Sequence, residues 1–276
     1  MLSLTYLFVP ATEDRKVAKA MQSGADAVIL DLEDSIIDAM KETARLHLAE
    51  YLRAQPPAAT GPQVWVRVNN TDALFAADVK AIPWKNVSGA VLPKAERAER
   101  IRTLASAGAK RVLPIIESAA GFKALSDLAA TGSVERFAIG TWDLAIDIGI
   151  VAVKPDDSEL IWQLRGDLVL ASRQLDLPPP VDGVHAQFDD DEGLKTLSER
   201  VHRMGFGAKL LIHPRQIAVV ASVFRPGEHA LEHARDVIRA YDNAVREGRG
   251  AVQLNGEMVD RPIVERARAL LRRYSS

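Results

Sequence analysis

The chain has 276 residues, of which 47% are hydrophobic and 26% are charged, and its formal net charge is -2. This composition is typical of a globular protein with one large domain or two small ones, and the charge provides no basic surface for nucleic acid or an anionic membrane. The absence of cysteine excludes disulfides and thiol catalysis. No apolar run approaches the roughly 20 residues of a membrane span, and no signal peptide is evident, so we expect a cytoplasmic protein.

Eight short apolar runs with strand-like composition alternate with stretches of helical periodicity. The expected strands are residues 5–9, 26–32, 64–68, 89–92, 112–116, 136–139, 181–184 and 209–212. Most of these runs lack polar alternation, which is typical of parallel strands buried on both faces. The pattern predicts an α/β fold, a (β/α)8 TIM barrel over residues 1–225. An open doubly wound sheet is the alternative, but it would need a glycine-rich loop after the first strand, and residues 10–12 contain no glycine.

Two further stretches lie outside the strand and helix repeat. The Pro/Gly-rich residues 55–62 predict a loop. Residues 226–276 predict a long helix, a hairpin turning at Asn255 and Gly256, and a last helix from Arg261. Because this C-terminal segment follows eight complete units, we interpret it as a lid or an arm exchanged between subunits.

Polar side chains follow several of the predicted strands, where the active sites of barrels lie. They are Asp31, Glu33, Arg67, Asn69, Lys94, Glu117, Asp143 and His213, the last of which we expect to be structural. Glu117 and Asp143 lie 26 residues apart, room for one helix, so they are expected at the ends of adjacent parallel strands. Two carboxylates side by side suit Mg2+, whereas the six histidines lack zinc-site spacing. The alternative is that both acids merely stabilise helix N-termini.

Eight segments, in order along nearly the whole chain, resemble the citrate lyase β-subunit and malyl-CoA or citramalyl-CoA lyase family (the HpcH/HpaI aldolase type of TIM barrel). They are LFVPATEDR (7–15), DAVILDLEDSI (26–36), VRVNN (66–70), VLPKAE (91–96), PIIESAAG (114–121), IGTWDLAIDIG (139–149), GFGAKLLIHPRQI (205–217) and NGEMVDRPIV (255–264).

The resemblance implies a Mg2+-dependent carbon-carbon lyase that cleaves a 3-hydroxy acyl-CoA, such as citramalyl-CoA or malyl-CoA, to acetyl-CoA and pyruvate or glyoxylate. It further implies that Glu117 and Asp143 are the metal ligands and that Arg67 faces the substrate. Asp260 resembles an acid/base supplied by a neighbouring subunit, which implies a homo-oligomer, a trimer or a multiple of it. The chain departs from the family pattern in two places: Leu4 and Thr5 replace Arg-Ser, and Trp142 replaces an acid found in many members.

The remaining site residues each have a second interpretation. Asn69 binds substrate or caps a helix, and Lys94 reaches a CoA phosphate or is a solvated surface lysine. Asp31 and Glu33 orient metal-bound waters without binding the metal, or form an ion pair with Arg67. Asp260 has the alternative of an ordinary N-cap before Pro262.

Three other functions remain open from the sequence. One is a citrate lyase β-subunit acting on a carrier-protein thioester, and another is a CoA-independent class II aldolase for hydroxy-oxo acids. The last is a barrel that binds such ligands without catalysis.

Overall fold

The computed structural model describes residues 2–54, 61–151 and 154–274, so most of the loop expected at 55–62 lies outside the described residues. Its contacts divide the chain into two compact units. One is Ser3–Phe224, and the other consists of Arg225–Ser276 with Met1–Leu2. No helix among the described residues has both the length and the apolar composition needed to cross a membrane.

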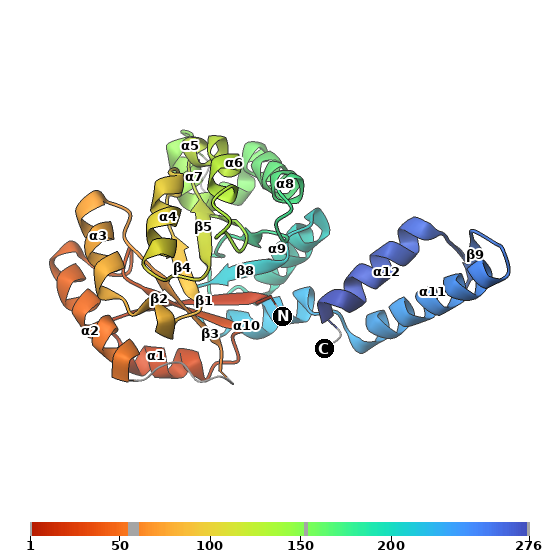
Figure 1. Ribbon diagram of the computed structural model, residues 1–276, viewed down its shortest axis with the longest axis horizontal. Helices are drawn as coiled ribbons and strands as arrows, with labels where there is room; N and C mark the ends of the chain where they lie inside the picture. Colours follow the sequence, from red (N-terminus) through yellow and green to blue (C-terminus); the bar gives the residue numbers. More distant parts are fainter. Residues whose placement is uncertain (1, 55–60, 152–153, 275–276) are drawn as a thin grey trace. The chain divides into compact units, whose positions relative to one another are not determined.

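The first unit is a closed barrel of parallel strands in sequence order, with an outer layer of helices around it (Figure 1). This confirms the predicted (β/α)8 fold. The strands are β1 (Thr5–Pro10), β2 (Ala27–Asp31), β3 (Gln63–Arg67), β4 (Gly89–Leu92), β5 (Val112–Ile116), β6 (Ala138–Ile139), β7 (Val181–Asp182) and β8 (Ala208–Leu211). β6 and β7 are shorter than the sequence predicted.

The helices of the barrel unit follow the strands in alternation, as the periodicity predicted. They are α1 (Asp14–Met21), α2 (Lys41–Ala54), α3 (Asp72–Ala81), α4 (Ala98–Ser106), α5 (Ala119–Lys123), α6 (Leu125–Ala129), α7 (Thr141–Asp147), α8 (Glu159–Gln174), α9 (Asp191–Met204) and α10 (Gln216–Phe224).

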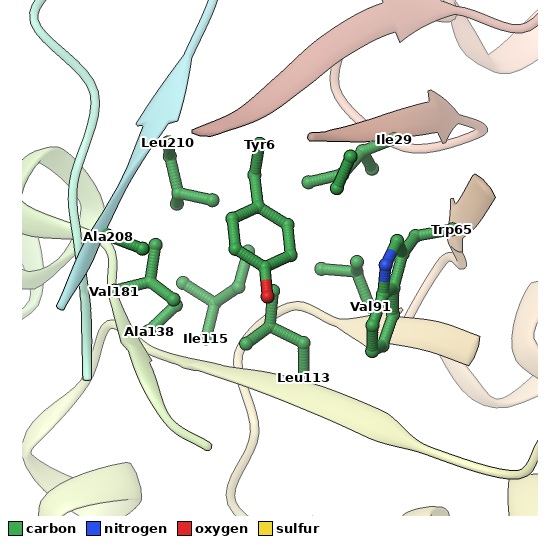
Figure 2. Close-up of a cluster of buried hydrophobic side chains, with 11 residues drawn as sticks. Tyr6, Ile29, Trp65, Val91, Leu113, Ile115, Ala138, Val181, Ala208 and Leu210 are labelled. Atoms are coloured by element: carbon green, nitrogen blue, oxygen red, sulfur yellow. The ribbon is translucent and has the colours of Figure 1, made fainter. Parts of the chain in front are cut away.

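The interior of the barrel is filled by side chains, and the Tyr6 ring lies at the centre of this cluster (Figure 2). The Trp65 ring packs edge-on against it at a centroid distance of 6.1 Å. Tyr6 Oη donates to Glu135 Oε1 at 3.0 Å and accepts from Arg136 Nη2 at 3.0 Å. Burial raises the pKa of Tyr6 to about 12. Because Tyr6 lies near the start of β1, the core closes the amino end of the barrel and leaves the carboxyl ends of the strands for a site.

The second unit consists of α11 (Glu228–Arg246), a hairpin of β9 (Val252–Leu254) and β10 (Glu257–Val259), and α12 (Arg261–Tyr274). Asn255 and Gly256 have φ angles of 51° and 89°, as the predicted type I′ turn requires. The unit has an apolar core of its own, which includes Val237, Val259 and Val264. Its role as a lid or exchanged arm stays a prediction.

Candidate active site

A cavity of about 440 Å3 opens at the carboxyl ends of the barrel strands. Its charged lining residues are Asp31, Asp34, Arg67, Glu117 and Asp143. The rest of the lining is mainly apolar and consists of Phe8, Val9, Pro10, Ser35, Ile115, Ile139, Gly140, Thr141, Trp142, Val184, Leu210 and Ile212. The cavity lining therefore combines charged side chains with a larger number of apolar ones.

Glu117 and Asp143 enter this cavity from neighbouring strands, as the sequence predicted. β5 and β6 pair in parallel with Ile116 opposite Ile139, Glu117 follows β5, and Asp143 lies in the first turn of α7. Ser118 rather than Glu117 is the N-cap of α5, because its hydroxyl accepts from the Gly121 N–H. The structure therefore does not support Glu117 as a helix-capping acid. Asp143, in the first turn of α7, can still stabilise the N-terminus of that helix.

Gly140 provides the room that Glu117 occupies. A Cβ built on Gly140 would lie 2.9 Å from the Glu117 Cβ and closer still to Oε2. Any larger residue would displace the carboxylate, so the glycine before α7 is a functional position that the sequence analysis missed. Its only sequence signal is that it interrupts the apolar run before Asp143.

The surroundings of Glu117 favour a bound cation. Burial raises the pKa of Glu117 to about 8; the backbone N–H of Lys94 opposes this shift, while the charges of Glu33 and Asp143 add to it. The Lys94 N–H is 2.5 Å from Oε1, and no hydrogen bond from a cationic side chain reaches Glu117 within the described part of the chain. A buried carboxylate beside a second acid, with no hydrogen bond from a described cationic side chain, fits a divalent metal ion.

Within the described residues, no three His, Cys, Asp or Glu side chains are grouped so as to hold a metal ion. Two carboxylates alone suit Mg2+, which keeps several water or substrate ligands, better than a metal held by a complete protein cage. The donor set at Glu117 and Asp143 therefore fits Mg2+.

Arg67 is at once a cavity-lining residue and the centre of an ion-pair cluster. Its Nε and Nη2 donate to the two oxygens of Asp31 at 2.6 and 2.7 Å, and Nη1 lies 2.8 Å from Glu33 Oε2 and 3.2 Å from Asp34 Oδ2. Burial alone would raise the pKa of Asp31, but the hydrogen bonds and charge of Arg67 hold it below its usual value. Arg67 therefore forms the ion pairs that were the alternative interpretation of this residue. Because it also lines the cavity, it can still contact a substrate.

Glu33 connects Arg67 to Lys94, whose Nζ lies 3.1 Å from Glu33 Oε1. Lys94 has a φ angle of 45°, unusual for a residue with a side chain, and in this conformation its N–H points to Glu117. Lys94 does not line the first cavity but a neighbouring polar one of about 460 Å3. A contact between Lys94 and a CoA phosphate would therefore form in the second cavity and not in the first.

Asn69 also lines the second cavity, but its amide is engaged with the protein. Its Nδ2 donates to Leu32 O at 3.0 Å and to Asp78 Oδ2 at 2.8 Å. These contacts hold the residue in the barrel wall, and contact with substrate stays a prediction.

Asp260 belongs to the second unit, between β10 and α12. Its Oδ1 accepts from the Ile263 N–H at 3.4 Å, the contact of a weak N-cap. His213, for which we expected a structural role, makes two local contacts: its Nδ1 accepts from the Arg215 N–H, and its ring packs on Phe188.

Comparison with known proteins agrees with this geometry. A family model described as HpcH/HpaI aldolase/citrate lyase matches residues 4–214. The chain is 31% identical to the citrate lyase subunit beta of Leuconostoc mesenteroides subsp. cremoris, with 98% of this chain and 93% of the relative covered. It is 33% identical to the (3S)-malyl-CoA thioesterase of Cereibacter sphaeroides, with 96% and 92% covered.

A solved structure of the protein CitE from Mycobacterium tuberculosis, in complex with magnesium, acetoacetate and coenzyme A, is similar to this chain with a TM-score of 0.80. The two are 31% identical, and the match covers 99% of this chain and 98% of that one. The chain therefore belongs to the HpcH/HpaI aldolase/citrate lyase family of enzymes.

Proposed function

We propose that the protein is a Mg2+-dependent carbon-carbon lyase that cleaves a 3-hydroxy acyl-CoA, such as citramalyl-CoA or malyl-CoA, to acetyl-CoA and pyruvate or glyoxylate. The observation that carries this proposal is the pair of carboxylates, Glu117 and Asp143, facing the same cavity as Arg67. A metal-competent acid pair beside a fixed cation suits a substrate with a hydroxyl group next to a carboxylate.

Glu117 and Asp143 would hold the metal. When bound, Mg2+ would act as a Lewis acid on the substrate's hydroxyl and carboxylate, which lowers the pKa of the hydroxyl. Arg67, held in place by Asp31, would bind the carboxylate or the oxygen on which negative charge develops. Its orientation is fixed before substrate arrives, so little ordering is needed at the moment of reaction.

Asp260 of another subunit would accept the hydroxyl proton as general base. The bond between the hydroxyl-bearing carbon and the thioester's α-carbon then breaks, and its electron pair moves into the thioester as an enolate. The hydroxyl carbon becomes the carbonyl of the keto acid. Return of the proton to the α-carbon gives acetyl-CoA, so atoms and charge balance without another reagent.

The names of the relatives support this class of substrate. The solved structure of CitE contains magnesium, a keto acid and coenzyme A, and another from Mycobacterium tuberculosis contains magnesium and pyruvate. These ligands were bound to those two solved proteins. The likeness over nearly the whole length of the first of them supports the same ligand classes for this chain.

Two other activities have support from relatives. The citrate lyase subunit beta relatives favour cleavage of a citryl thioester on a carrier protein, and the (3S)-malyl-CoA thioesterase relatives favour hydrolysis of the thioester without carbon-carbon cleavage. The products distinguish them, because a lyase releases a keto acid and no thiol, whereas a thioesterase releases free CoA.

The test is an assay of the purified full chain with citramalyl-CoA and malyl-CoA, with Mg2+ and with EDTA, following keto acid and free thiol in parallel. We expect Mg2+-dependent release of keto acid without an equal release of thiol. Thiol release alone would assign a thioesterase. Turnover of free hydroxy-oxo acids but not of thioesters would assign a CoA-independent aldolase, and binding without turnover would leave a non-catalytic barrel.

A further inference from the structure

We propose that the cavity selects a substrate whose keto-acid half carries an apolar substituent, as in pyruvate, and rejects a second carboxylate, as in oxaloacetate. We further assign Trp142, which is part of the cavity wall, as a specificity-determining residue. The inference rests on the proposed function, since it concerns which keto acid that reaction releases.

The first argument is the charge of the cavity. Of the described residues that line it, Asp31, Asp34, Glu117 and Asp143 are acidic and only Arg67 is basic. Arg67 is itself paired with both oxygens of Asp31. A metal ion held by Glu117 and Asp143, together with Arg67, can match one substrate carboxylate. A second carboxylate would find no free cation among these lining residues.

The second argument is the chemistry of the apolar part of the lining. The guanidinium carbon of Arg67 lies 4.7 Å from the centre of the Phe8 ring, so the surface beside the cation is apolar. Ile115 and Leu210 continue this surface from the barrel core, and Val184 packs against the same core. A carboxylate placed on these groups loses its water without gaining a partner, whereas a methyl group gains contact.

Trp142 is also part of the cavity wall. It lies in the first turn of α7, next to Asp143, and it is 40% exposed. Ile146, four residues later and therefore on the same side of the helix, is also exposed. Because Trp142 is not part of the buried core, its side chain can be replaced without opening a cavity in the fold. It is therefore a suitable position for testing the wall.

The experiment measures the dissociation constants of pyruvate, glyoxylate and oxaloacetate by calorimetry at saturating Mg2+. It also measures kcat/KM for citramalyl-CoA, malyl-CoA and citryl-CoA. These substrates differ in one substituent, which is methyl, hydrogen or carboxymethyl. We expect methyl to be preferred over hydrogen by about 10-fold and over carboxymethyl by about 100-fold or more. Equal or tighter binding of oxaloacetate would overturn the proposal.

Variants then test Trp142 itself. Trp142→Lys adds a cation to the wall, and we expect the ratio of pyruvate to oxaloacetate affinity to fall about fivefold, whereas Trp142→Phe should keep the ratio. Leu170→Lys, at an exposed position of α8, is the control for an added charge elsewhere. Thermal unfolding shows whether each variant is folded. An unchanged ratio in folded Trp142→Lys would remove Trp142 from specificity.

The two proposals fail separately. Cleavage of citryl-CoA in preference to the other two thioesters would overturn the apolar selection and leave the lyase proposal standing. Tighter binding of pyruvate than of oxaloacetate, without cleavage of any thioester, would support the selection and overturn the lyase. Absence of both binding and cleavage would overturn both.

Discussion

Asp31 and Arg67 are register partners on the adjacent strands β2 and β3, and their side chains form two parallel hydrogen bonds of 2.6 and 2.7 Å. Asp31 also accepts from the backbone N–H groups of Glu33 and Ser35. The loop after β2 thus fixes the carboxylate, and the carboxylate fixes the guanidinium at the edge of the cavity. Asp31 is a positioning residue that acts through Arg67.

Asp31→Asn is expected to lower stability by about 3 kcal/mol, because it leaves a buried guanidinium without its principal partner, and to lower activity by at least about 10-fold. The pKa of Asp31 is held below its usual 3.8, so its stabilising effect is present above that pH and lost as the pH falls through the lowered pKa. Urea unfolding from pH 2 to 7 measures the loss of stability and its dependence on pH. Asp72→Asn, which removes a fully exposed partner of an ion pair, is the control and should leave stability nearly unchanged.

Gly140→Ala is expected to weaken Mg2+ binding and turnover, because the new Cβ collides with Glu117. The cost in stability should be about 1–3 kcal/mol, as for an overpacked site. Calorimetric titration with Mg2+ and unfolding experiments measure the two effects. Gly166→Ala is the matched control: it lies in α8, where an added Cβ would meet no described atom within 4 Å. Gly166→Ala should raise the stability by about 0.5–1 kcal/mol without changing the affinity for Mg2+. Normal Mg2+ affinity in Gly140→Ala would refute the steric role.

The metal-free protein should lose stability as the pH rises from about 4.5 to about 8. The pKa of Glu117 is raised from 4.5 to about 8, so the folded state retains a proton that the unfolded state has released. Mg2+ requires the ionised carboxylate, so stabilisation by Mg2+ should increase over the same range. Melting temperatures with EDTA and with Mg2+ test this. In Glu117→Gln this part of the pH dependence should disappear; its persistence would assign it to another group.

Glu117→Ala and Asp143→Ala should each abolish Mg2+-dependent turnover, since one remaining carboxylate holds the metal poorly. Titration with Mg2+ should show the loss of affinity directly, even in a variant without measurable activity. Glu192→Ala, in the first turn of α9 and away from the cavity lining, serves as a control. Retained Mg2+-dependent activity in either ligand variant would end the metal assignment.

The proposed role of Asp260 gives a prediction about assembly. If Asp260 acts in the site of another subunit, Asp260→Asn and Glu117→Gln should each be inactive alone, while coexpression of the two should restore part of the activity in mixed oligomers. Asn at this position keeps an oxygen that can accept from Ile263, so the start of α12 should survive. Full activity of a chain truncated after Glu247 would contradict the shared site, and light scattering would test the expected trimer.

The sequence by itself determined the barrel, the order of its strands and the adjacency of Glu117 and Asp143. These follow from local signals, because apolar runs and helical periodicity are encoded in short segments, and parallel strands in a closed barrel bring their carboxyl ends to one face. It also determined the Asn255 and Gly256 turn, since that pair adopts the required backbone angles readily. Most of the eight segments that carry the family resemblance include one of those strand ends.

Only the tertiary structure decided how the site residues contact one another. Asp31 and Arg67 are 36 positions apart, and they form an ion pair because the register of β2 and β3 places them opposite each other. Other features of the site also depend on the meeting of distant segments. They are the packing of the Glu117 side chain against Gly140, the burial that raises the pKa of Glu117, and the hydrogen bond from Asn69 to Asp78. Burial and steric contact are properties of packed atoms, so no local pattern in the sequence contains them.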